Sequence, residues 1–264
     1  MIRLYYREMI SAIVLSHNSQ ASIKHCLAGL NFCSEIIVID DHSSDKTVVM
    51  AQKAGAKVRS RQLNGDFAAQ RNFGLTKAAG DWVLFIDSDE IIDRDLRFEI
   101  VKKIGNCSDN IQGFYLKRKD RFLGKWLPHG ETGQIKLLRL GKKNAGKWQG
   151  KVHETWLIRG KKASLKAPLL HQRQLTVAQF MTRLQNYAQV RAKELYGGGV
   201  KENWLMMWIK PISKFIENYV LRLGFLDGAP GLAMAYLMSW HSLLVRLWLK
   251  LYWRNHGQEV FKVQ

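Results

Sequence analysis

Three acidic residues follow a strongly apolar segment in the first third of the chain. Asp87, Asp89 and Glu90 come after residues 82–86, whose five apolar side chains are typical of a strand buried on both faces. Ligands of open α/β sheets bind at the carboxyl ends of the strands. Asp87 and Asp89 lie two positions apart, so in an extended segment their carboxylates point the same way. Together they could hold a hard divalent cation that keeps phosphate oxygens as further ligands. The plainer alternative is that Asp89 only caps the following helix.

A second pair of acids, Asp40 and Asp41, ends the apolar segment 35–40. If both segments are parallel strands, the two acidic groups become neighbours at one edge of the sheet. One group could then bind a nucleoside, and the other a metal ion with its diphosphate. The chain has neither a Gly-x-Gly-x-x-Gly after its first strand nor a Gly-x-x-x-x-Gly-Lys, so the dehydrogenase and P-loop classes lack their phosphate cradles. The pattern therefore indicates nucleotide-sugar chemistry.

The elements that must position these acids alternate between strand and helix. We predict strands over residues 10–15, 35–40, 57–60 and 82–86. Asp66 stands where a helix should begin, ahead of a segment that ends at Gly80. Strand and helix alternating at this short spacing predict a parallel sheet and therefore an α/β fold.

The character of the sequence changes after residue 95. Residues 113–117 and 134–140 alternate like half-exposed strands, and 148–158 is predicted as another strand. Thr176 and Gln179 form a capping box, and the pattern beyond it is helical. We expect a catalytic domain over 9–175, with a nucleotide-sugar-binding half (9–95) and an acceptor half (96–175), followed by a helical extension over 176–264.

The whole chain of 264 residues carries a net charge of +19, and this positive charge is concentrated in its second half. Residues 1–90 hold ten Lys and Arg against ten Asp and Glu, whereas residues 91–175 hold twenty against seven. Residues 176–264 add eleven against five. A neutral sheet followed by a basic half predicts a polyanionic partner, and nucleic acid, anionic lipid and phosphorylated glycan all qualify.

The helical extension is rich in tryptophan and leucine beside basic residues. Residues 231–245 are nearly all apolar, but a membrane-spanning helix needs about 20 such residues. Arg246, Lys250 and Arg254 are spaced by four and form one basic stripe. This combination predicts a helix that lies in an anionic membrane interface. The alternative is a set of amphipathic helices packed on the sheet, with their lysines in solvent.

Four segments together resemble glycosyltransferase family 2, the inverting enzymes with the GT-A fold. They are Leu15-Ser16-His17-Asn18, the loop 40–47, residues 65–72 and Asp87-Ser88-Asp89-Glu90. Within the family the chain looks most like the lipopolysaccharide-core β-1,4-glucosyltransferases, through Val152-His153-Glu154 and the Gly-Phe-Leu-Asp-Gly sequence of residues 224–228. Many relatives have Asn-Glu where this chain has Asn18-Ser19. The Gln-x-x-Arg-Trp element of processive synthases is absent, which indicates the addition of a single sugar.

The resemblance implies a mostly parallel GT-A sheet flanked by helices, with a role for each acid. Asp41 would bind the nucleobase or ribose, supported by Asp40. Asp87 would lie on the sugar–ribose side of the donor, and Asp89 would hold Mg²⁺ or Mn²⁺.

The resemblance also implies roles for residues outside the acidic loops. Arg71 and Asn72 would face the diphosphate or donor sugar, although Arg71 could instead be an ordinary helix-surface charge. His153 would be a further metal ligand, with a structural core histidine as the alternative. Glu131 is narrowly favoured as the general base over Glu154, which would orient the site.

These implications predict a hexosyltransferase that moves one hexose, with glucose from UDP-glucose favoured, onto an inner-core sugar of lipopolysaccharide or lipooligosaccharide. Its partners would be the nucleotide-sugar donor, a phosphorylated glycolipid acceptor and an anionic membrane surface. Three cysteines without a Cys-x-x-Cys pair and an N-terminus without a long apolar segment predict a cytoplasmic location. The basic amphipathic helices place the protein peripherally on the inner face of the inner membrane.

Two alternatives remain at this point. The first is a family 2 enzyme that acts on a polyprenyl phosphate or another cell-envelope glycan, although the paired C-terminal membrane spans usual in that group are missing. The second is a basic nucleic-acid-binding protein whose aromatic residues stack on bases. We disfavour it, because the acidic strand ends would repel phosphate.

Overall fold

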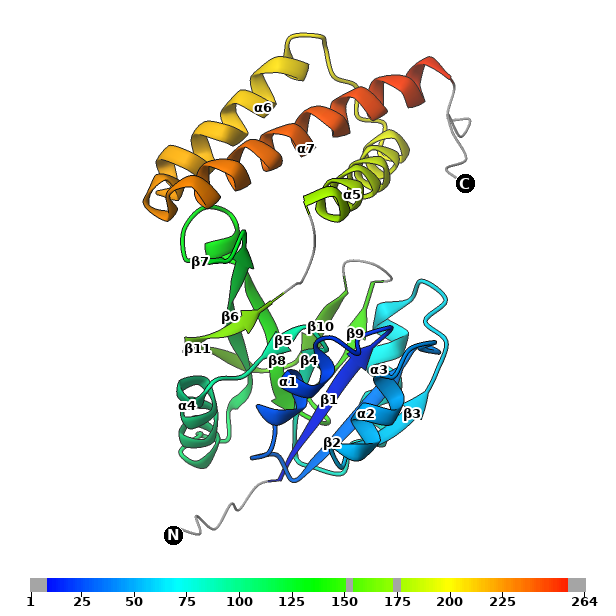
Figure 1. The fold of residues 1–264 in the computed structure, drawn as a ribbon, viewed down its shortest axis with the longest axis vertical. Helices are drawn as coiled ribbons and strands as arrows, with labels where there is room; N and C mark the ends of the chain where they lie inside the picture. Colours follow the sequence, from blue (N-terminus) through cyan, green and yellow to red (C-terminus); the bar gives the residue numbers. More distant parts are fainter. Residues whose placement is uncertain (1–8, 151–153, 173–176, 256–264) are drawn as a thin grey trace. The chain divides into compact units, whose positions relative to one another are not determined.

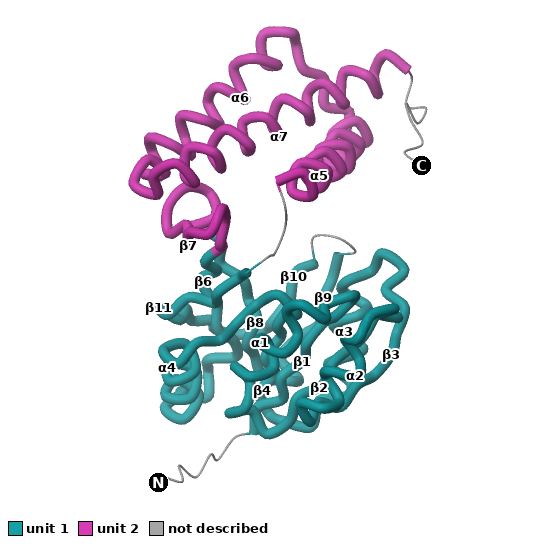
Figure 2. Tube along the Cα trace, in the orientation of Figure 1, with its two compact units in different colours: residues 1–119, 135–172 teal, residues 120–134, 173–264 magenta. Residues whose placement is uncertain are grey.

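The structure, a computed structural model, describes residues 9–150, 154–172 and 177–255, which form two compact units (Figure 2). The first unit comprises residues 1–119 and 135–172, and the second comprises 120–134 and 173–264. The second unit resumes at residue 173, and the sequence prediction placed a boundary after residue 175. Residues 120–134, however, group with the C-terminal helices rather than with the predicted acceptor half.

Four parallel strands form one half of the sheet in the first unit (Figure 1). They are β1 (Ile10–Ser16), β2 (Glu35–Asp40), β3 (Lys57–Ser60) and β4 (Trp82–Asp87). Their order is β3-β2-β1-β4, and every neighbouring pair among them is parallel. β1 and β4 are almost completely buried, as expected for central strands covered on both faces. The predicted parallel sheet and the positions of these strands are confirmed.

Helices connect these strands and follow the last of them. They are α1 (Ile23–Ala28), α2 (Thr47–Lys53), α3 (Phe67–Lys77) and α4 (Arg94–Gly105). Asp66 begins α3 as predicted, because its carboxylate accepts a hydrogen bond from the backbone N–H of Ala69 (2.8 Å). α3 lies close to the sheet at Gly74, where a Cβ atom would be 2.6 Å from Cγ2 of Ile13. This close approach fixes Arg71, which lies one turn earlier on the same helix.

Antiparallel strands extend the same sheet beyond β4. They are β8 (Lys136–Lys142), β6 (Ile111–Phe122), β11 (Lys161–His171) and β5 (Glu90–Ile91), in that order across the sheet. β8 pairs directly with β4, and β11 places His171 beside Glu90 of β5. The sheet is therefore mixed, and its antiparallel half supplies residues to the edge where the acids lie.

A separate hairpin replaces the predicted strand over residues 148–158, and that prediction is wrong. The hairpin consists of β9 (Gly146–Gln149) and β10 (Thr155–Ile158). The strand cannot continue after β9, because Gly150 adopts a positive φ of 90°. Trp148 and Trp156 face each other across the hairpin with their rings 5.4 Å apart, and both meet the ring of Phe85 edge-on. The hairpin is thereby anchored to β4, with Glu154 directly before β10.

The second unit is largely helical (Figure 1). It contains β7 (Lys125–Leu127), α5 (Val177–Gly197), α6 (Met206–Ile216), the π-helical turn η2 (Glu217–Leu221), the 3₁₀ turn η3 (Gly224–Asp227) and α7 (Ala229–Arg254). Ala188 and Ala192 of α5 pack with Val245 and Leu249 of α7. α6 follows α5 in the helical extension predicted over 176–264.

α7 is, among the residues that the structure describes, the one helix long and apolar enough to cross a membrane. Length and composition alone are weak evidence of a span, because the core helix of a helical unit passes the same test. The basic stripe predicted on this helix is interrupted. Arg246 turns inward towards Glu202 (3.4 Å) with only 18% of its side chain exposed, whereas Lys250 and Arg254 are exposed.

Glu35, at the start of β2, connects several strands of the parallel sheet and should make stability depend on pH. Its carboxylate accepts hydrogen bonds from Ser11 of β1 (2.6 Å), from Lys57 of β3 (2.8 Å) and from the backbone N–H of Ala79 (2.7 Å). Burial would raise the pKa of Glu35, but these hydrogen bonds and the charge of Lys57 lower it below the ordinary value. The ionised carboxylate therefore stabilises the folded state above an unfolded pKa of about 4.3.

We expect Glu35→Gln to lower the free energy of unfolding by about 1–2 kcal/mol near neutral pH, because the amide accepts fewer and weaker hydrogen bonds. The difference from wild type should shrink as pH falls from about 4.3 through the lowered pKa. Urea unfolding at several pH values measures this. A difference that stays constant with pH would contradict the assignment.

Candidate active site

The acidic strand ends lie at the same edge of the parallel sheet. In the register of the sheet, Ser16 of β1 lies beside Asp40 of β2, and Leu15 of β1 lies beside Asp87 of β4. The two acidic groups therefore share this edge, as predicted, and β1 lies between the strands that carry them. The space between the acids is therefore controlled by the loop that follows β1.

The loop after β1 joins the two acidic loops. Asn18 accepts a hydrogen bond through Oδ1 from the backbone N–H of Ser44 (2.9 Å). The hydroxyl of Ser19 lies 2.7 Å from the hydroxyl of Ser88 in the loop after β4. The backbone N–H of Ser19 also donates a hydrogen bond to the hydroxyl of Thr47 (2.6 Å). The Asn18-Ser19 pair, where many relatives have Asn-Glu, thus places a short hydroxyl bridge between the loops.

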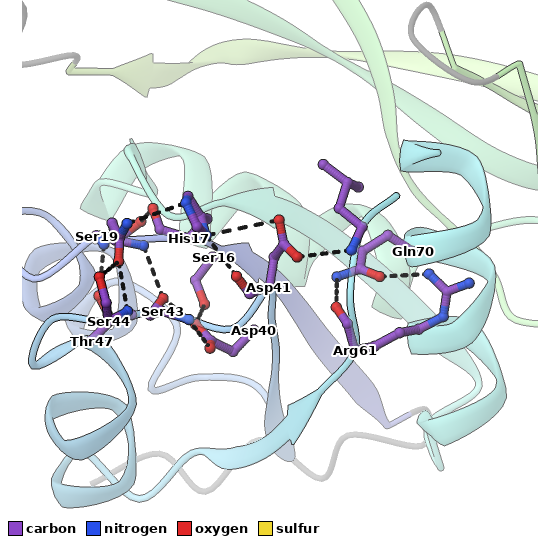
Figure 3. Close-up of polar contacts among 12 residues, drawn as sticks. Ser16, His17, Ser19, Asp40, Asp41, Ser43, Ser44, Thr47, Arg61 and Gln70 are labelled. Carbon is purple, nitrogen blue, oxygen red and sulfur yellow. Dashed lines mark hydrogen bonds and ion pairs between the residues drawn. The ribbon is translucent and has the colours of Figure 1, made fainter. Parts of the chain in front are cut away.

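Asp40 is buried and braces its own loop (Figure 3). Its Oδ1 accepts hydrogen bonds from the hydroxyls of Ser16 (2.9 Å) and Ser43 (2.6 Å), and its Oδ2 accepts one from the backbone N–H of Ser43 (2.8 Å). A carboxylate engaged in this way shapes the loop that carries Asp41.

Asp41 connects the loops that follow β2 and β3 (Figure 3). Its Oδ1 accepts a hydrogen bond from the backbone N–H of Leu63 (2.8 Å). Nδ1 of His17 lies 2.6 Å from the backbone carbonyl oxygen of Asp41 and 3.8 Å from its Oδ2. The side chain is 23% exposed, so Oδ2 can accept a hydrogen bond from a ligand such as a ribose or a base.

Asp87, whose side chain is 31% exposed, forms an ionic cluster with two arginines that are almost completely buried. Its Oδ1 accepts a hydrogen bond from Nη2 of Arg71 (2.8 Å), and its Oδ2 accepts one from Nη2 of Arg139 (2.7 Å). Arg71 also donates through Nε to Glu154 (2.9 Å), and its guanidinium lies 4.8 Å from the ring centre of Trp148. The side chain of Arg71 is only 2% exposed, which rules out the alternative of an ordinary helix-surface charge.

The cluster lowers the pKa of Asp87 and raises the pKa of Glu90. Burial alone would raise the pKa of Asp87, but Arg139 and Arg71 outweigh burial and hold that pKa well below its usual range. Glu90 is completely buried, and burial together with the negative charge of Asp87 raises its pKa, although Arg139 acts against this. Two guanidinium groups thus face three carboxyl groups, those of Asp87, Glu154 and Glu90.

Asp89, the predicted metal ligand, lies near His171. Its side chain is 26% exposed, and its Oδ2 lies 3.4 Å from Nε2 of His171 at the end of β11. No group of three or more His, Cys, Asp or Glu side chains able to hold a metal occurs in the described ranges. His153, the predicted further ligand, lies outside those ranges. A carboxylate with one imidazole still fits Mg²⁺ or Mn²⁺, since such ions take water and phosphate oxygens as remaining ligands.

The side-chain amide of Asn72 forms two hydrogen bonds with the backbone of Trp148. Its Nδ2 donates to the carbonyl oxygen of Trp148 (2.9 Å), and its Oδ1 accepts from the N–H of Trp148 (3.0 Å). These bonds tie α3 to β9 next to Arg71. They favour a positioning role for Asn72, and contact with the donor stays a prediction.

Glu131 lies on a loop of the second unit. Its Oε2 is 3.0 Å from Nζ of Lys214 on α6, and its side chain is 37% exposed. The loop turns at Gly130, which has a φ of 66°, and again at Gly133. A Cβ atom on Gly133 would lie 2.1 Å from the carbonyl oxygen of Pro128. Both glycines that flank Glu131 are therefore required by the shape of the loop.

Asp227, from the Gly-Phe-Leu-Asp-Gly sequence, fastens this loop. Its Oδ1 lies 2.7 Å from Nδ1 of His129, and its Oδ2 accepts a hydrogen bond from the backbone N–H of His129 (3.2 Å). The carbonyl oxygen of Asp227 accepts a hydrogen bond from Nζ of Lys125 (3.0 Å). Asp227 is 2% exposed, so the segment after α6 supports the Glu131 loop from within the unit.

The first unit brings most of the predicted site residues together, and the second unit holds one. Six of them lie around the carboxyl edge of the sheet or are linked to it by Arg71: Asp40, Asp41, Arg71, Asp87, Asp89 and Glu154. Arg139 and His171 were missed by the sequence analysis. A charged residue inside the apolar segment 137–141 could have revealed Arg139, whereas His171 has no local signal because its neighbours come from distant strands.

The sequence and the fold both have relatives among known glycosyltransferases. The model of glycosyl transferase family 2 matches residues 11–162. The lipopolysaccharide core biosynthesis glycosyltransferase LpsC of Rhizobium meliloti (strain 1021) is 25% identical over 244 residues, which are 87% of this chain and 90% of LpsC.

Two solved structures are similar in fold. One is glucosyl-3-phosphoglycerate synthase from Mycobacterium tuberculosis in complex with Mn²⁺, UDP and glucosyl-3-phosphoglycerate, with a TM-score of 0.47, 18% identity, and coverage of 75% of this chain and 82% of that one. The other is S. aureus TarS 1–349 in complex with UDP, with a TM-score of 0.48, 17% identity, and coverage of 97% and 94%.

A mixed sheet with acids at the carboxyl ends of its parallel strands, together with the family match and the match with LpsC, defines the class of protein as a hexosyltransferase with the GT-A fold. The chain belongs to glycosyltransferase family 2. The predicted family, fold and enzyme class are therefore confirmed.

The contact between Asp227 and His129 should control the Glu131 loop. Asp227→Asn weakens the bond to the imidazole of His129 and should lower the free energy of unfolding by about 1–3 kcal/mol. If the loop serves the acceptor, the acceptor KM should rise several-fold while the Kd of the donor stays unchanged. Glu194→Gln, which removes an exposed ion pair with Arg191 in the same unit, is the matched control and should have almost no effect. A donor Kd that weakens as much as the acceptor KM would contradict this role.

Proposed function

We propose that the chain transfers one hexose, glucose from UDP-glucose, onto an inner-core sugar of lipopolysaccharide or lipooligosaccharide, with inversion at the anomeric carbon. The observation that carries this proposal is the match with LpsC over nearly the full length of both chains. The acids gathered at one edge of the sheet fit a nucleotide-sugar donor, and the basic second half fits a phosphorylated acceptor.

The donor would lie across the loops after β2 and β4. We assign Asp41 to the base or ribose, because its Oδ2 lies on the partly exposed side of its loop. Asp40 supports Asp41 by holding the loop through Ser16 and Ser43. Asp87 is assigned to the sugar–ribose side of the donor, where the paired arginines keep it anionic and fixed.

Asp89 would hold Mg²⁺ or Mn²⁺, and His171 lies close enough to share the ion. When bound, the ion would neutralise the charge that develops on the departing diphosphate. Asp87 is a poorer ligand, since Arg71 and Arg139 occupy both of its oxygens. His153 stays a predicted ligand.

Glu131 is favoured as the general base, and Glu154 as a residue that orients the site through Arg71. The acceptor hydroxyl oxygen attacks the anomeric carbon while its proton passes to the carboxylate of the base. The bond between the anomeric carbon and the diphosphate oxygen breaks, and its electron pair leaves with the diphosphate. Lys214, 3.0 Å from Glu131, would position the carboxylate for this step.

The acceptor of this reaction would be a phosphorylated glycolipid. We therefore place the protein at the cytoplasmic face of the inner membrane, bound peripherally to its anionic surface. The excess of positive charge after residue 90 supports this placement.

Release of nucleoside diphosphate from a panel of UDP- and GDP-sugars tests the proposed function. Each donor is offered with core oligosaccharide, with a polyprenyl phosphate, or with no acceptor. We expect release from UDP-glucose with core oligosaccharide, loss of activity in EDTA, and recovery with Mn²⁺. Asp89→Asn should stay folded but remain inactive at every Mn²⁺ concentration. Transfer to the polyprenyl phosphate alone, or full activity in EDTA, would count against the proposal.

Replacing Glu131 should affect kcat, whereas replacing Glu154 should affect donor affinity and Tm. Glu131→Gln should lower kcat by about 10²–10⁴-fold, as expected for a lost general base, and leave the Kd of UDP unchanged. Glu154→Gln removes the carboxylate from Nε of the buried Arg71, so it should lower both donor affinity and Tm. Isothermal titration with UDP and initial-rate kinetics separate these effects. The reverse pattern would make Glu154 the base.

A further inference from the structure

The outer side of α6 carries an apolar surface, which we call the α6 face. It is formed by Trp208, Ile209, Ile212, Ile216, Val220 and Leu223, which are all exposed. The five from Trp208 to Val220 recur at helical spacing through α6 and η2, so they share one side of the helix, and Leu223 lies two residues after η2. Trp208 is 51% exposed and Ile212 is 58% exposed. Contiguous exposed apolar surface of this kind is unusual unless a partner covers it.

The charged residues of α6 are engaged in ion pairs within the unit instead, whereas Ser213 is exposed beside the α6 face. Lys210 forms an ion pair with Glu202, and Lys214 forms one with Glu131. Asn218 is 2% exposed and donates a hydrogen bond to the carbonyl oxygen of Lys214 (3.1 Å). A helix at the surface of a globular unit normally turns its charged side to water and its apolar side to the core. On α6 the exposed positions are largely apolar and Lys214 is only 28% exposed, so the apolar side favours an apolar environment outside the unit.

We infer that the α6 face docks on an anionic membrane and inserts its apolar side chains into the interface. Tryptophan and aliphatic side chains on one face of a helix are typical of interfacial helices. Residues 120–134 and 173–264 hold fourteen Lys and Arg against seven Asp and Glu. This positive charge attracts an anionic surface, whereas it would repel a second copy of the same unit. Lys201, which precedes α6, is exposed and adds to the attraction.

The same helix links the membrane to the acceptor loop. The outward side of α6 would enter the interface, and its inward Lys214 holds Glu131. Docking would therefore hold the Glu131 loop at a fixed distance from the membrane surface, close to the sugars of a lipid-anchored acceptor. This consequence rests on the proposed function, while membrane docking itself can be measured without it.

Co-sedimentation of the full chain with vesicles tests the inference. The wild-type protein should pellet with vesicles of phosphatidylethanolamine and phosphatidylglycerol, and less with phosphatidylcholine alone. Ile212→Glu places a charge in the middle of the α6 face and should lower the ratio of bound to free protein at least about tenfold. Phe98→Glu is the matched control, because Phe98 is 68% exposed on α4 of the first unit, and it should bind like wild type. Circular dichroism and turnover of a soluble acceptor should be unchanged in both variants.

A second readout reports insertion directly. An environment-sensitive fluorophore on Ile212→Cys should shift its emission to the blue when anionic vesicles are added, and the same label on Phe98→Cys should not. The shift should survive added salt after binding, since inserted apolar side chains are not screened.

Three outcomes would overturn the inference. The first is wild-type protein that does not pellet with anionic vesicles. The second is Ile212→Glu that pellets as well as wild type. The third is a wild-type dimer in solution that Ile212→Glu converts to a monomer, because the α6 face would then join two copies. Vesicle binding without any sugar transfer would refute the proposed function and leave the docking surface intact.

Discussion

The pairing of buried charges around Asp87 is the constraint on which the first unit depends. Removing one partner from a buried ion pair costs about 3–5 kcal/mol, because the remaining charge is left unpaired. Arg71 comes from α3, Arg139 comes from β8, and Glu154 directly precedes β10. These elements must therefore keep fixed positions relative to the end of β4. The result is a rigid edge of the sheet, with Asp87 held in place and Asp89 partly exposed two residues later.

The acids that directly follow the parallel strands could be predicted from the sequence. The residues that reach the site from distant strands could not. Uninterrupted apolar segments fixed the positions of β1, β2 and β4, and the acids that follow them had to emerge at one edge. Arg139 and His171 reach the same edge through antiparallel pairing of β8 and β11, which no local pattern encodes. The order of strands was also hidden, so the insertion of β1 between the two acidic strands was missed. The hairpin of β9 and β10 was read as one strand because Gly150 was not taken as the end of β9.

The second unit shows a different limit of sequence reasoning. Periodicity identified apolar and basic sides of its helices, but it could not tell which side faces the interior. In the structure Arg246 turns inward and the aliphatic side of α6 turns outward, against the usual rule. In the sequence, Gly-Phe-Leu-Asp-Gly carried only a family resemblance. In the structure, Asp227 of this segment bonds to the imidazole of His129. One helix thus carries both an unpartnered apolar face and the contact to Glu131.

The central claim is that two arginines keep Asp87 away from the metal ion and leave Asp89 to bind it. Diffraction data collected at the manganese absorption edge, from crystals grown with UDP and Mn²⁺, would locate the ion directly. The expected result is one anomalous peak at coordination distance from a carboxylate oxygen of Asp89, with Asp87 still bonded to Arg71 and Arg139. A peak coordinated by Asp87, with the arginines displaced from its oxygens, would contradict the claim.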